Sequence, residues 1–242
     1  MYQLEYLDKL GRFYHKPRPG FSFGTTLHNA LQFFHEAGGP QTVSIDSITT
    51  YVAEHWVSGG YENADAELAA KENAARIVAE YHAASAAKPQ TTEVFLSEKQ
   101  LSWDMGDWIL IGRVDRVDEH LHDQTLEIVD YKSGRTVVTP EDVTNALAMS
   151  VYQFLLKRSY PNRLVTATIY ALQTNVSATV AMSDSDLLEL ESFLQLTVRE
   201  IMSTDFHDVE PEYKPVCLTC DYKPRCSKHW IARSQADADI IL

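Results

Sequence analysis

The sequence predicts an α/β fold in which helices flank a mixed central β-sheet, and three observations support this class. Apolar residues recur with a helical period through much of residues 1–88. After Lys88-Pro89 the period changes, and three consecutive segments carry the β-branched and aromatic content of strands. A helix-like segment then precedes two more strand-like segments. We therefore expect an antiparallel three-strand meander, to which a crossover helix adds a further strand.

The elements follow in order along the chain. The expected helices of the first part are residues 23–37, a segment around 45–52, and 64–87. Glycine pairs end the first two, and the third is rich in Ala, Glu and Lys. The expected strands are residues 92–103, 108–117, 126–131, 164–172 and 178–182.

Two further helices complete the expected arrangement. Thr139 followed by Pro140 starts a helix that should run to about Arg158. Ser183 caps a long amphipathic helix. We expect a single domain over residues 1–242, with a mainly helical part (1–88), a core (89–203) and a cysteine-bearing tail (204–242).

Composition and charge narrow the class of protein. The hydrophobic content of 45% and charged content of 23% are typical of a globular protein. The net charge of -13 argues against a protein that coats nucleic acid through bulk electrostatics, but permits an enzyme with a local basic groove. No apolar run has the length of a membrane span, and the N-terminal residues do not resemble a signal peptide. A cytoplasmic protein without membrane contact is expected.

Two acidic residues and a lysine lie at the ends of two neighbouring expected strands. Asp115 is near the end of strand 108–117, Asp130 is near the end of strand 126–131, and Lys132 follows two residues later. Residues i and i+2 of a strand point to the same face, so Asp130 and Lys132 should project together. A hairpin between the strands would bring Asp115 beside them.

This combination favours hydrolysis of a phosphodiester. Two adjacent carboxylates repel each other unless a cation neutralises them, and oxygen ligands suit Mg²⁺ or Mn²⁺. Such an ion activates water and stabilises charge on a phosphoryl group, while a neighbouring lysine stabilises the developing charge. On the pattern alone, surface charges at strand ends are the other interpretation. The apolar runs Ile109–Ile111 and Ile128-Val129 favour charges that emerge from a buried sheet.

These segments resemble the nuclease motif of the RecB-type branch of the PD-(D/E)XK superfamily, which includes the AddB nuclease domain. The family's Gly-Arg-hydrophobic-Asp and Val-Asp-Tyr-Lys-Ser/Thr-Gly segments match Gly112–Asp115 and Val129–Gly134. The resemblance implies a restriction-endonuclease-like core in which Asp115 and Asp130 bind the metal and act in catalysis. It also implies that the main-chain carbonyl of Tyr131 completes the coordination and that Lys132 is catalytic.

Three further residues enter through the same resemblance. Phe21–His28 is similar to the family's N-terminal helix motif, whose histidine joins the metal site. Glu93 lies where related nucleases carry a glutamate, and both a site and a surface position stay open for it. Tyr152 matches the tyrosine of a Gln-hydrophobic-x-x-Tyr pattern, although Ala148 replaces the glutamine. Substrate contact and core packing both stay open for Tyr152.

The three cysteines of the chain are Cys217, Cys220 and Cys226. Such a closely spaced odd number, in a chain without an export signal, indicates metal or cluster ligation by thiolates. The family resemblance implies a [4Fe–4S] cluster, whose fourth cysteine lies near the N-terminus of relatives. This sequence lacks it, and we expect the chain to start internally, just after that cysteine. A zinc site with His229, or a trio of reduced thiols, is the alternative.

The sequence therefore predicts a metal-dependent DNA nuclease, an exonuclease of repair, recombination or defence. Its expected partners are DNA, single-stranded or with ends, and a helicase or other repair protein. Basic residues near the motifs are expected to line a phosphate groove: Lys16, Arg18, Arg113, Arg116, Lys132, Arg135, Lys214, Lys223, Arg225 and Lys228. One alternative is a nuclease-fold subunit that binds DNA or a helicase and cuts weakly or not at all. The other is a metallohydrolase of small phosphate esters.

Overall fold

The structure, a computed structural model, describes residues 2–134, 136–209 and 212–226. The chain divides into two units, one formed by residues 18–194 and a smaller one formed by residues 1–17 with 195–242. None of the helices in the described part of the chain is long and apolar enough to cross a membrane.

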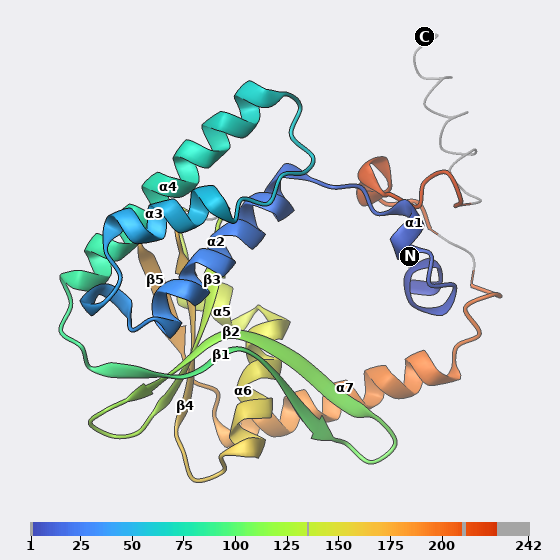
Figure 1. Ribbon diagram of the computed structural model, residues 1–242. Coiled ribbons are helices and arrows are strands. Elements are labelled where there is room, and N and C mark those ends of the chain that lie inside the picture. Colours follow the sequence, from blue (N-terminus) through green and yellow to red (C-terminus); the bar gives the residue numbers. More distant parts are fainter. Residues whose placement is uncertain (1, 135, 210–211, 227–242) are drawn as a thin grey trace. The chain divides into compact units, whose positions relative to one another are not determined.

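A five-stranded mixed sheet forms the centre of the larger unit (Figure 1). Its strands, in spatial and chain order, are β1 (Thr92–Asp104), β2 (Ile109–His120), β3 (Leu126–Lys132), β4 (Val165–Ala171) and β5 (Val176–Val180). Neighbouring strands are antiparallel except β3 and β4, which run parallel. This confirms the predicted meander followed by a crossover.

Three helices cover one face of the sheet (Figure 1, blue to teal): α2 (Pro19–Glu36), α3 (Ile45–Glu54) and α4 (Ala64–Ala86). Their starts follow local chemistry, because Ser44 and Asn63 accept hydrogen bonds from the amides of Ser47 and Ala66. Gly38, with φ 98°, takes the left-handed conformation just after α2. The apolar faces of the three helices share one core with Val129, Tyr131 and Tyr170 of the sheet.

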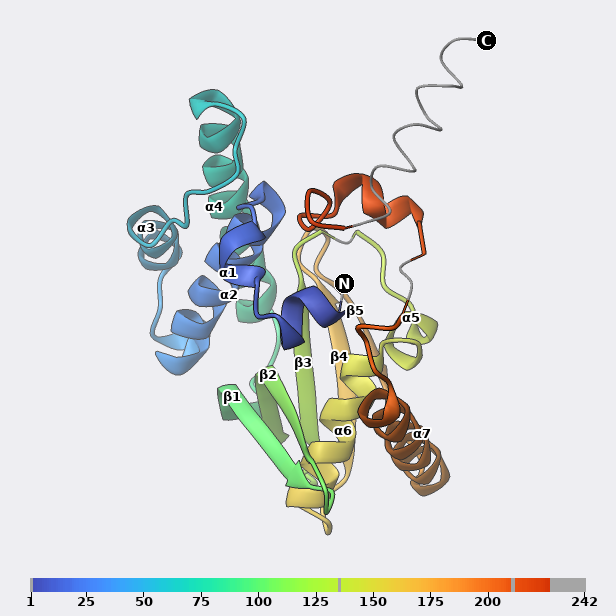
Figure 2. The same ribbon diagram turned by 90° about the vertical axis from the view of Figure 1, so that its right-hand side faces the viewer.

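The opposite face of the sheet is covered by α5 (Pro140–Thr144) and α6 (Leu147–Ser159), as Figure 2 shows. The prediction of one helix from Thr139 to about Arg158 is wrong. Thr139 and Asp142 form a capping box at the expected start, but the helix ends at Thr144, with Asn145 as its C-cap. Ala146 adopts extended backbone before α6 begins. This break allows side chains of both helices, such as Val143 and Met149, to enter the same core.

Alternation along β3 explains why both faces of the sheet are covered. Leu126 and Ile128 belong to the core beneath α6, whereas Val129 and Tyr131 belong to the core beneath α2, α3 and α4. Strands buried on both faces read as continuous apolar runs, as β3 does. A third, smaller cluster joins Phe154 of α6 to Leu190 and Leu194 of α7 (Asp184–Ser203).

The smaller unit contains η1 (Gln3–Leu7), α1 (Gly11–Tyr14), the last part of α7 and η3 (Pro215–Thr219). The sequence analysis did not predict η1, α1 or η3. A polar contact joins its N-terminal and cysteine-bearing segments. The buried Tyr222 hydroxyl donates to the Glu5 carboxylate, and His15 Nε2 lies 2.8 Å from Glu5 Oε2.

Candidate metal centre

Three potential metal ligands meet where α2 contacts β1 and β2 in the larger unit. Ligand atoms of His28 on α2, Glu98 on β1 and Asp115 on β2 all lie within 4.8 Å of one another. Within the described part of the chain, this is the group of three His, Cys, Asp or Glu side chains that meets this distance. The three side chains are partly exposed, so an ion from solvent could reach them.

The backbone of Tyr131 connects His28 to Asp115. The Tyr131 N–H donates to Asp115 Oδ2 at 2.9 Å, and His28 Nε2 lies 3.2 Å from the Tyr131 carbonyl oxygen. The other ring nitrogen, His28 Nδ1, lies 3.4 Å from Asp115 Oδ2. Both nitrogens of His28 therefore face acceptors, and a neutral imidazole could donate to only one of them.

Because both ring nitrogens face acceptors, the protonated form of His28 is favoured. Burial alone would lower the pKa of His28, but the contact with Asp115 and the charges of Asp115, Asp130 and Glu98 raise it above its usual value. A protonated imidazole satisfies both neighbours. A divalent cation between His28 and the carboxylates would replace that proton as the positive charge of the cluster.

Asp130 and Lys132 lie on the same face of β3, as their spacing predicts. Lys132 Nζ is 2.6 Å from Asp130 Oδ2, so the two side chains form an ion pair. Burial raises the pKa of Asp130, which Lys132 opposes and Asp115 reinforces. The buried carboxylate thus has the Lys132 ammonium as a close positive neighbour.

These residues fit a divalent cation. Carboxylate and carbonyl oxygens with one imidazole suit Mg²⁺ or Mn²⁺, and ligand atoms of His28, Glu98 and Asp115 lie close enough together to share one ion. When bound, the cation would supply positive charge that stabilises a phosphoryl group in hydrolysis. The amine of Lys132, with 43% of its side chain exposed, is accessible to a phosphate oxygen or an attacking water.

Glu98 was missed by the sequence interpretation, which considered Glu93. Arg113 Nε donates to Glu98 Oε2 at 3.0 Å, and Glu98 has a positive φ of 44°. The property that could have identified Glu98 is the pairing register of the β1–β2 hairpin. Ser97 pairs with Arg116 and Lys99 with Val114, which places Glu98 opposite Asp115. Glu93 pairs instead with Glu119 and lines a cavity described below.

Tyr152 of α6 packs against β2 and lies near the same carboxylates. Its pKa is raised by burial and then by the charges of Asp130, Asp115 and Glu98. The ring packs against the backbone at Gly112, where a Cβ atom would lie 3.0 Å from Tyr152 Cδ1. Tyr152 also borders the core beneath α6. Its position combines core packing with proximity to the carboxylates of Asp130, Asp115 and Glu98.

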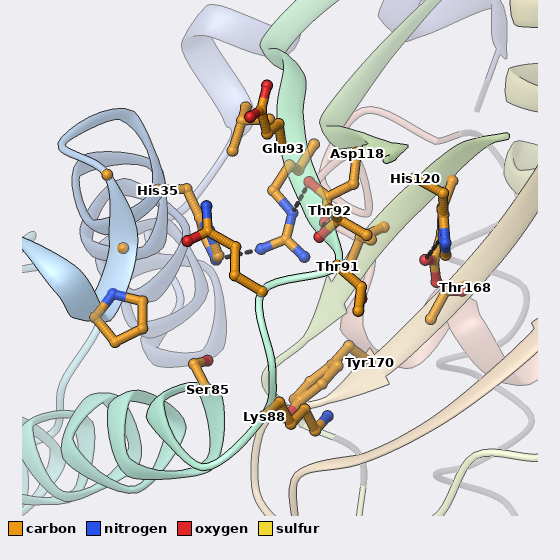
Figure 3. A pocket seen from close by; sticks show the side chains of 18 of the residues that line it. His35, Ser85, Lys88, Thr91, Thr92, Glu93, Asp118, His120, Thr168 and Tyr170 are labelled. Atoms are coloured by element: carbon orange, nitrogen blue, oxygen red, sulfur yellow. Dashed lines mark hydrogen bonds and ion pairs between the residues drawn. The ribbon is translucent and has the colours of Figure 1, made fainter. Parts of the chain in front are cut away.

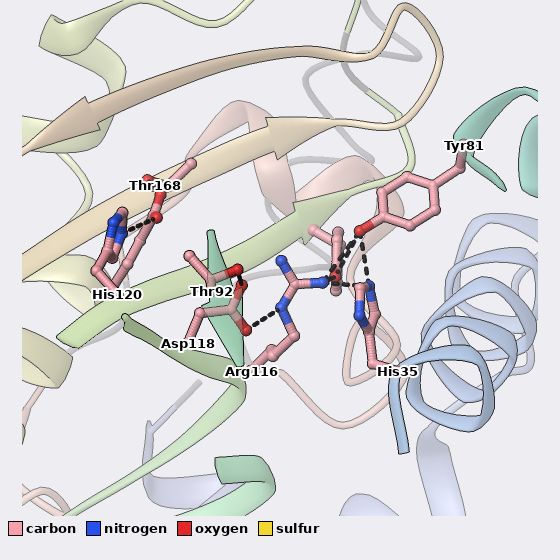
Figure 4. A network of polar contacts seen from close by, with 9 residues as sticks. His35, Tyr81, Thr92, Arg116, Asp118, His120 and Thr168 are labelled. Carbon is pink, nitrogen blue, oxygen red and sulfur yellow. Dashed lines mark hydrogen bonds and ion pairs between the residues drawn. The ribbon is translucent and has the colours of Figure 1, made fainter. Parts of the chain in front are cut away.

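Arg116 is buried, so its predicted place in a surface phosphate groove is wrong. Its Nη1 contacts the Tyr81 and Tyr131 hydroxyls and His35, and its Nε lies 2.9 Å from Asp118 Oδ1 (Figure 4). Arg135 and Lys228 lie outside the described residues.

Arg116 and His35 also separate two hollows. One is the small cleft that contains His28, Glu98 and Asp115. The other is a cavity of about 840 Å³ lined by polar side chains such as Glu93, Asp118 and Lys88 (Figure 3). Its lining carries acidic side chains together with basic ones such as Lys88 and Arg116.

The cysteines lie in the smaller unit and are free, partly exposed thiols. Cys217 is in η3, and its Sγ lies 3.4 Å from the Lys214 amide nitrogen. The close group of three potential ligands in the described chain does not include them. His229, the proposed alternative ligand, lies outside the described residues.

Comparison with known proteins now identifies the family. Residues 1–227 match the model of the PD-(D/E)XK nuclease superfamily, and the chain belongs to this superfamily. Its five-stranded mixed sheet with flanking helices agrees with the restriction-endonuclease-like fold. A search of curated proteins found no match. A solved structure described as "Crystal structure of SSO0001" covers 86% of this chain and 95% of its own, at 10% identity and a TM-score of 0.33, and we draw nothing from it.

Proposed function

We propose that the protein is a Mg²⁺- or Mn²⁺-dependent deoxyribonuclease of the RecB- and AddB-like type. The observation that carries this proposal is the convergence of His28, Glu98 and Asp115 within 4.8 Å in a superfamily member. Asp130 and Lys132 of the neighbouring strand supply the remaining charges. We further propose that it acts as an exonuclease in DNA repair, recombination or defence.

Each residue has a role in this proposal. His28, Glu98, Asp115, Asp130 and the Tyr131 carbonyl would hold the cation, and Asp115 and Asp130 would thereby serve catalysis. Lys132 would hold the attacking water or donate to the phosphate oxygen on which charge develops. Tyr152 would flank the strand next to the carboxylates.

Cleavage of end-labelled DNA tests the proposal. Single-stranded oligonucleotides with 5′ or 3′ labels are incubated with the protein and Mn²⁺, and products are separated by length. We expect stepwise shortening from one end, and a loss of about a hundredfold or more in Lys132→Ala. Lys71→Ala, a change of the same type on α4, should cleave like the wild type.

The same assay separates the alternatives. An oligonucleotide that is bound but never cut would identify a binding subunit and overturn the nuclease proposal. Nucleotide monoesters hydrolysed faster than oligonucleotides would identify a small phosphate ester as the substrate. Internal fragments from both labels would replace the exonuclease mode with an endonuclease mode.

The cysteine segment carries a separate proposal. Cys217, Cys220 and Cys226 would bind an iron–sulfur cluster or Zn²⁺, with a structural role. Metal analysis and visible absorbance of anaerobically purified protein would distinguish the two, and protein free of both metals would contradict the proposal. A helicase partner, a preference for single strands or ends, and a cytoplasmic location stay predictions.

A further inference from the structure

Tyr131 contacts its neighbours through its backbone and through its side-chain hydroxyl, and it is the backbone that lies at the candidate metal centre. Its backbone contacts Asp115 through the amide and His28 through the carbonyl. Its ring makes an edge contact with the His28 ring at 6.1 Å, and beyond the ring the hydroxyl meets Arg116 Nη1 and lies 3.1 Å from the Tyr81 hydroxyl. Only 4% of the residue is exposed.

The ring between these ends is closely packed. The rings of Tyr81 and Tyr170 lie 5.9 and 6.2 Å from it in edge contacts, and the Arg116 guanidinium carbon lies 5.5 Å from its centre. A planar side chain with few rotatable bonds transmits such restraint to its own backbone. The contacts of the hydroxyl therefore restrain the ring, and the backbone that carries the ring is also held by the pairing of β3 with β4.

The residues around the Tyr131 hydroxyl, Arg116, Tyr81 and His35, also contact one another (Figure 4). Arg116 is 9% exposed, lies 2.9 Å from Asp118 through Nε, and donates to the Tyr81 hydroxyl at 3.0 Å. Tyr81 OH lies 2.8 Å from His35 Nε2. A planar guanidinium and rigid aromatic rings lose little conformational entropy when they form hydrogen bonds, so they hold the Tyr131 hydroxyl at a small entropic cost.

His35 connects this group to the metal centre by a second route. It follows His28 by seven residues on α2, so the two side chains lie on one face of the helix about two turns apart. His28 contacts the backbone of Tyr131, while His35 contacts the residues that hold its hydroxyl. One helix thus fixes both ends of the same tyrosine.

We propose that Arg116, Tyr81 and His35 are positioning residues that act through the Tyr131 ring to aim its main-chain carbonyl and amide at the metal centre. Arg116 and His35 line the small cleft that contains His28, Glu98 and Asp115, but neither they nor Tyr81 belong to that group of potential ligands. The inference rests on the proposed function, because it assigns the carbonyl of Tyr131 to the metal site. Partners of this kind typically contribute a factor of about 10 to 100 to metal affinity.

Tyr131→Phe tests the proposal, because it removes one hydroxyl and keeps the ring and the backbone. Free Mn²⁺ is counted by electron paramagnetic resonance during titration of the full chain without DNA. We expect the dissociation constant to rise about tenfold. Tyr170→Phe is the matched control, because Tyr170 belongs to the same ring cluster but its hydroxyl donates to Asn175. It should bind Mn²⁺ like the wild type.

A cleavage assay over a range of Mn²⁺ concentrations separates positioning from general damage to the fold. Tyr131→Phe should require more Mn²⁺ for half-maximal rate and approach the wild-type rate at saturation. A lower rate at every concentration with unchanged metal affinity would overturn the proposal. Wild-type protein that binds no Mn²⁺ would overturn the proposed function as well. Wild-type binding with equal affinity in Tyr131→Phe would overturn the positioning role alone.

Discussion

Glu98 and Glu93 lie on the same strand, yet they occupy different environments. Glu98 lies with His28 and Asp115, whereas Glu93 is exposed and lines the polar cavity. The pair therefore offers two substitutions with the same change of charge at different places. If Glu98 is a metal ligand, the two substitutions should affect metal binding differently, whereas a general electrostatic effect should be similar for both.

Glu98→Gln is expected to weaken Mn²⁺ binding by about tenfold or more, because a ligand should matter at least as much as an outer partner. Glu93→Gln should leave the dissociation constant unchanged, since screening weakens exposed charges at a distance. Titration calorimetry measures both. Equal weakening by the two substitutions would contradict a ligand role for Glu98.

His35 makes folding stability depend on pH. Burial, and then the charge of Arg116, hold the pKa of His35 well below its usual value. Below about pH 6.5 the unfolded chain takes up a proton that the folded protein does not. Its contribution to stability is therefore complete above this pH and is lost as the pH falls.

His35→Asn should reduce this pH dependence. Urea unfolding at pH 7.5 and 5.5 is expected to show a larger loss of stability on acidification in the wild type. The difference attributable to His35 is at most about 1.4 kcal/mol per pH unit below 6.5. Asp130 and Asp118, whose pKa values burial raises, oppose this trend in both proteins. Equal pH dependence of the two proteins would show that His35 is protonated in the folded state.

At the scale of elements, the close contact of α6 with β2 brings Tyr152 near the carboxylates. This contact depends on Gly112, where a Cβ would lie 2.9 Å from Leu155 Cδ1 and 3.0 Å from the Tyr152 ring. A methyl group there would have to push α6 away from the strand. Such overpacking costs energy because protein interiors have few voids.

Gly112→Ala is therefore expected to destabilise the protein by about 1–3 kcal/mol and to lower the cleavage rate. Thermal unfolding and the oligonucleotide assay measure the two effects. Gly20→Ala in α2 is the control, because its Cβ would meet no atom within 4 Å and alanine favours a helix. Unchanged stability of Gly112→Ala would show that α6 shifts freely.

At the scale of the whole molecule, the net charge of -13 disfavours contact with DNA. The carboxylates of the candidate metal centre would add to this repulsion where the phosphate of the proposed substrate would approach. Binding of DNA should therefore depend on the divalent cation as well as on basic side chains.

Fluorescence anisotropy with the Lys132→Ala variant tests this dependence without cleavage of the labelled oligonucleotide. We expect affinity to fall by about tenfold or more when EDTA replaces Mn²⁺, and to fall further with added salt. Equal affinity with and without the cation would place the DNA away from the metal centre.

Much of this protein was predictable from local sequence. The strands, the parallel crossover and the projection of Asp130 with Lys132 follow from apolar periodicity and the two-residue repeat of a strand. The motif residues around Asp115 and Asp130 were recognisable because these short segments resemble the nuclease motif of the superfamily. The capping chemistry at Thr139 was predictable for the same reason, since it involves neighbours in the chain.

Tertiary structure decided those features that depend on contacts between residues far apart in the chain. Hairpin register selected Glu98 rather than Glu93 for the cluster with His28 and Asp115, and packing on the sheet split the expected helix at Asn145. Arg116 resembled a surface cation in sequence, but the fold buries it among hydroxyls that come from α4 and β3. Sequence by itself determined which chemical groups are present. Their partners were decided only when strands and helices far apart in the chain came together, because burial and hydrogen bonding depend on the complete environment of a side chain.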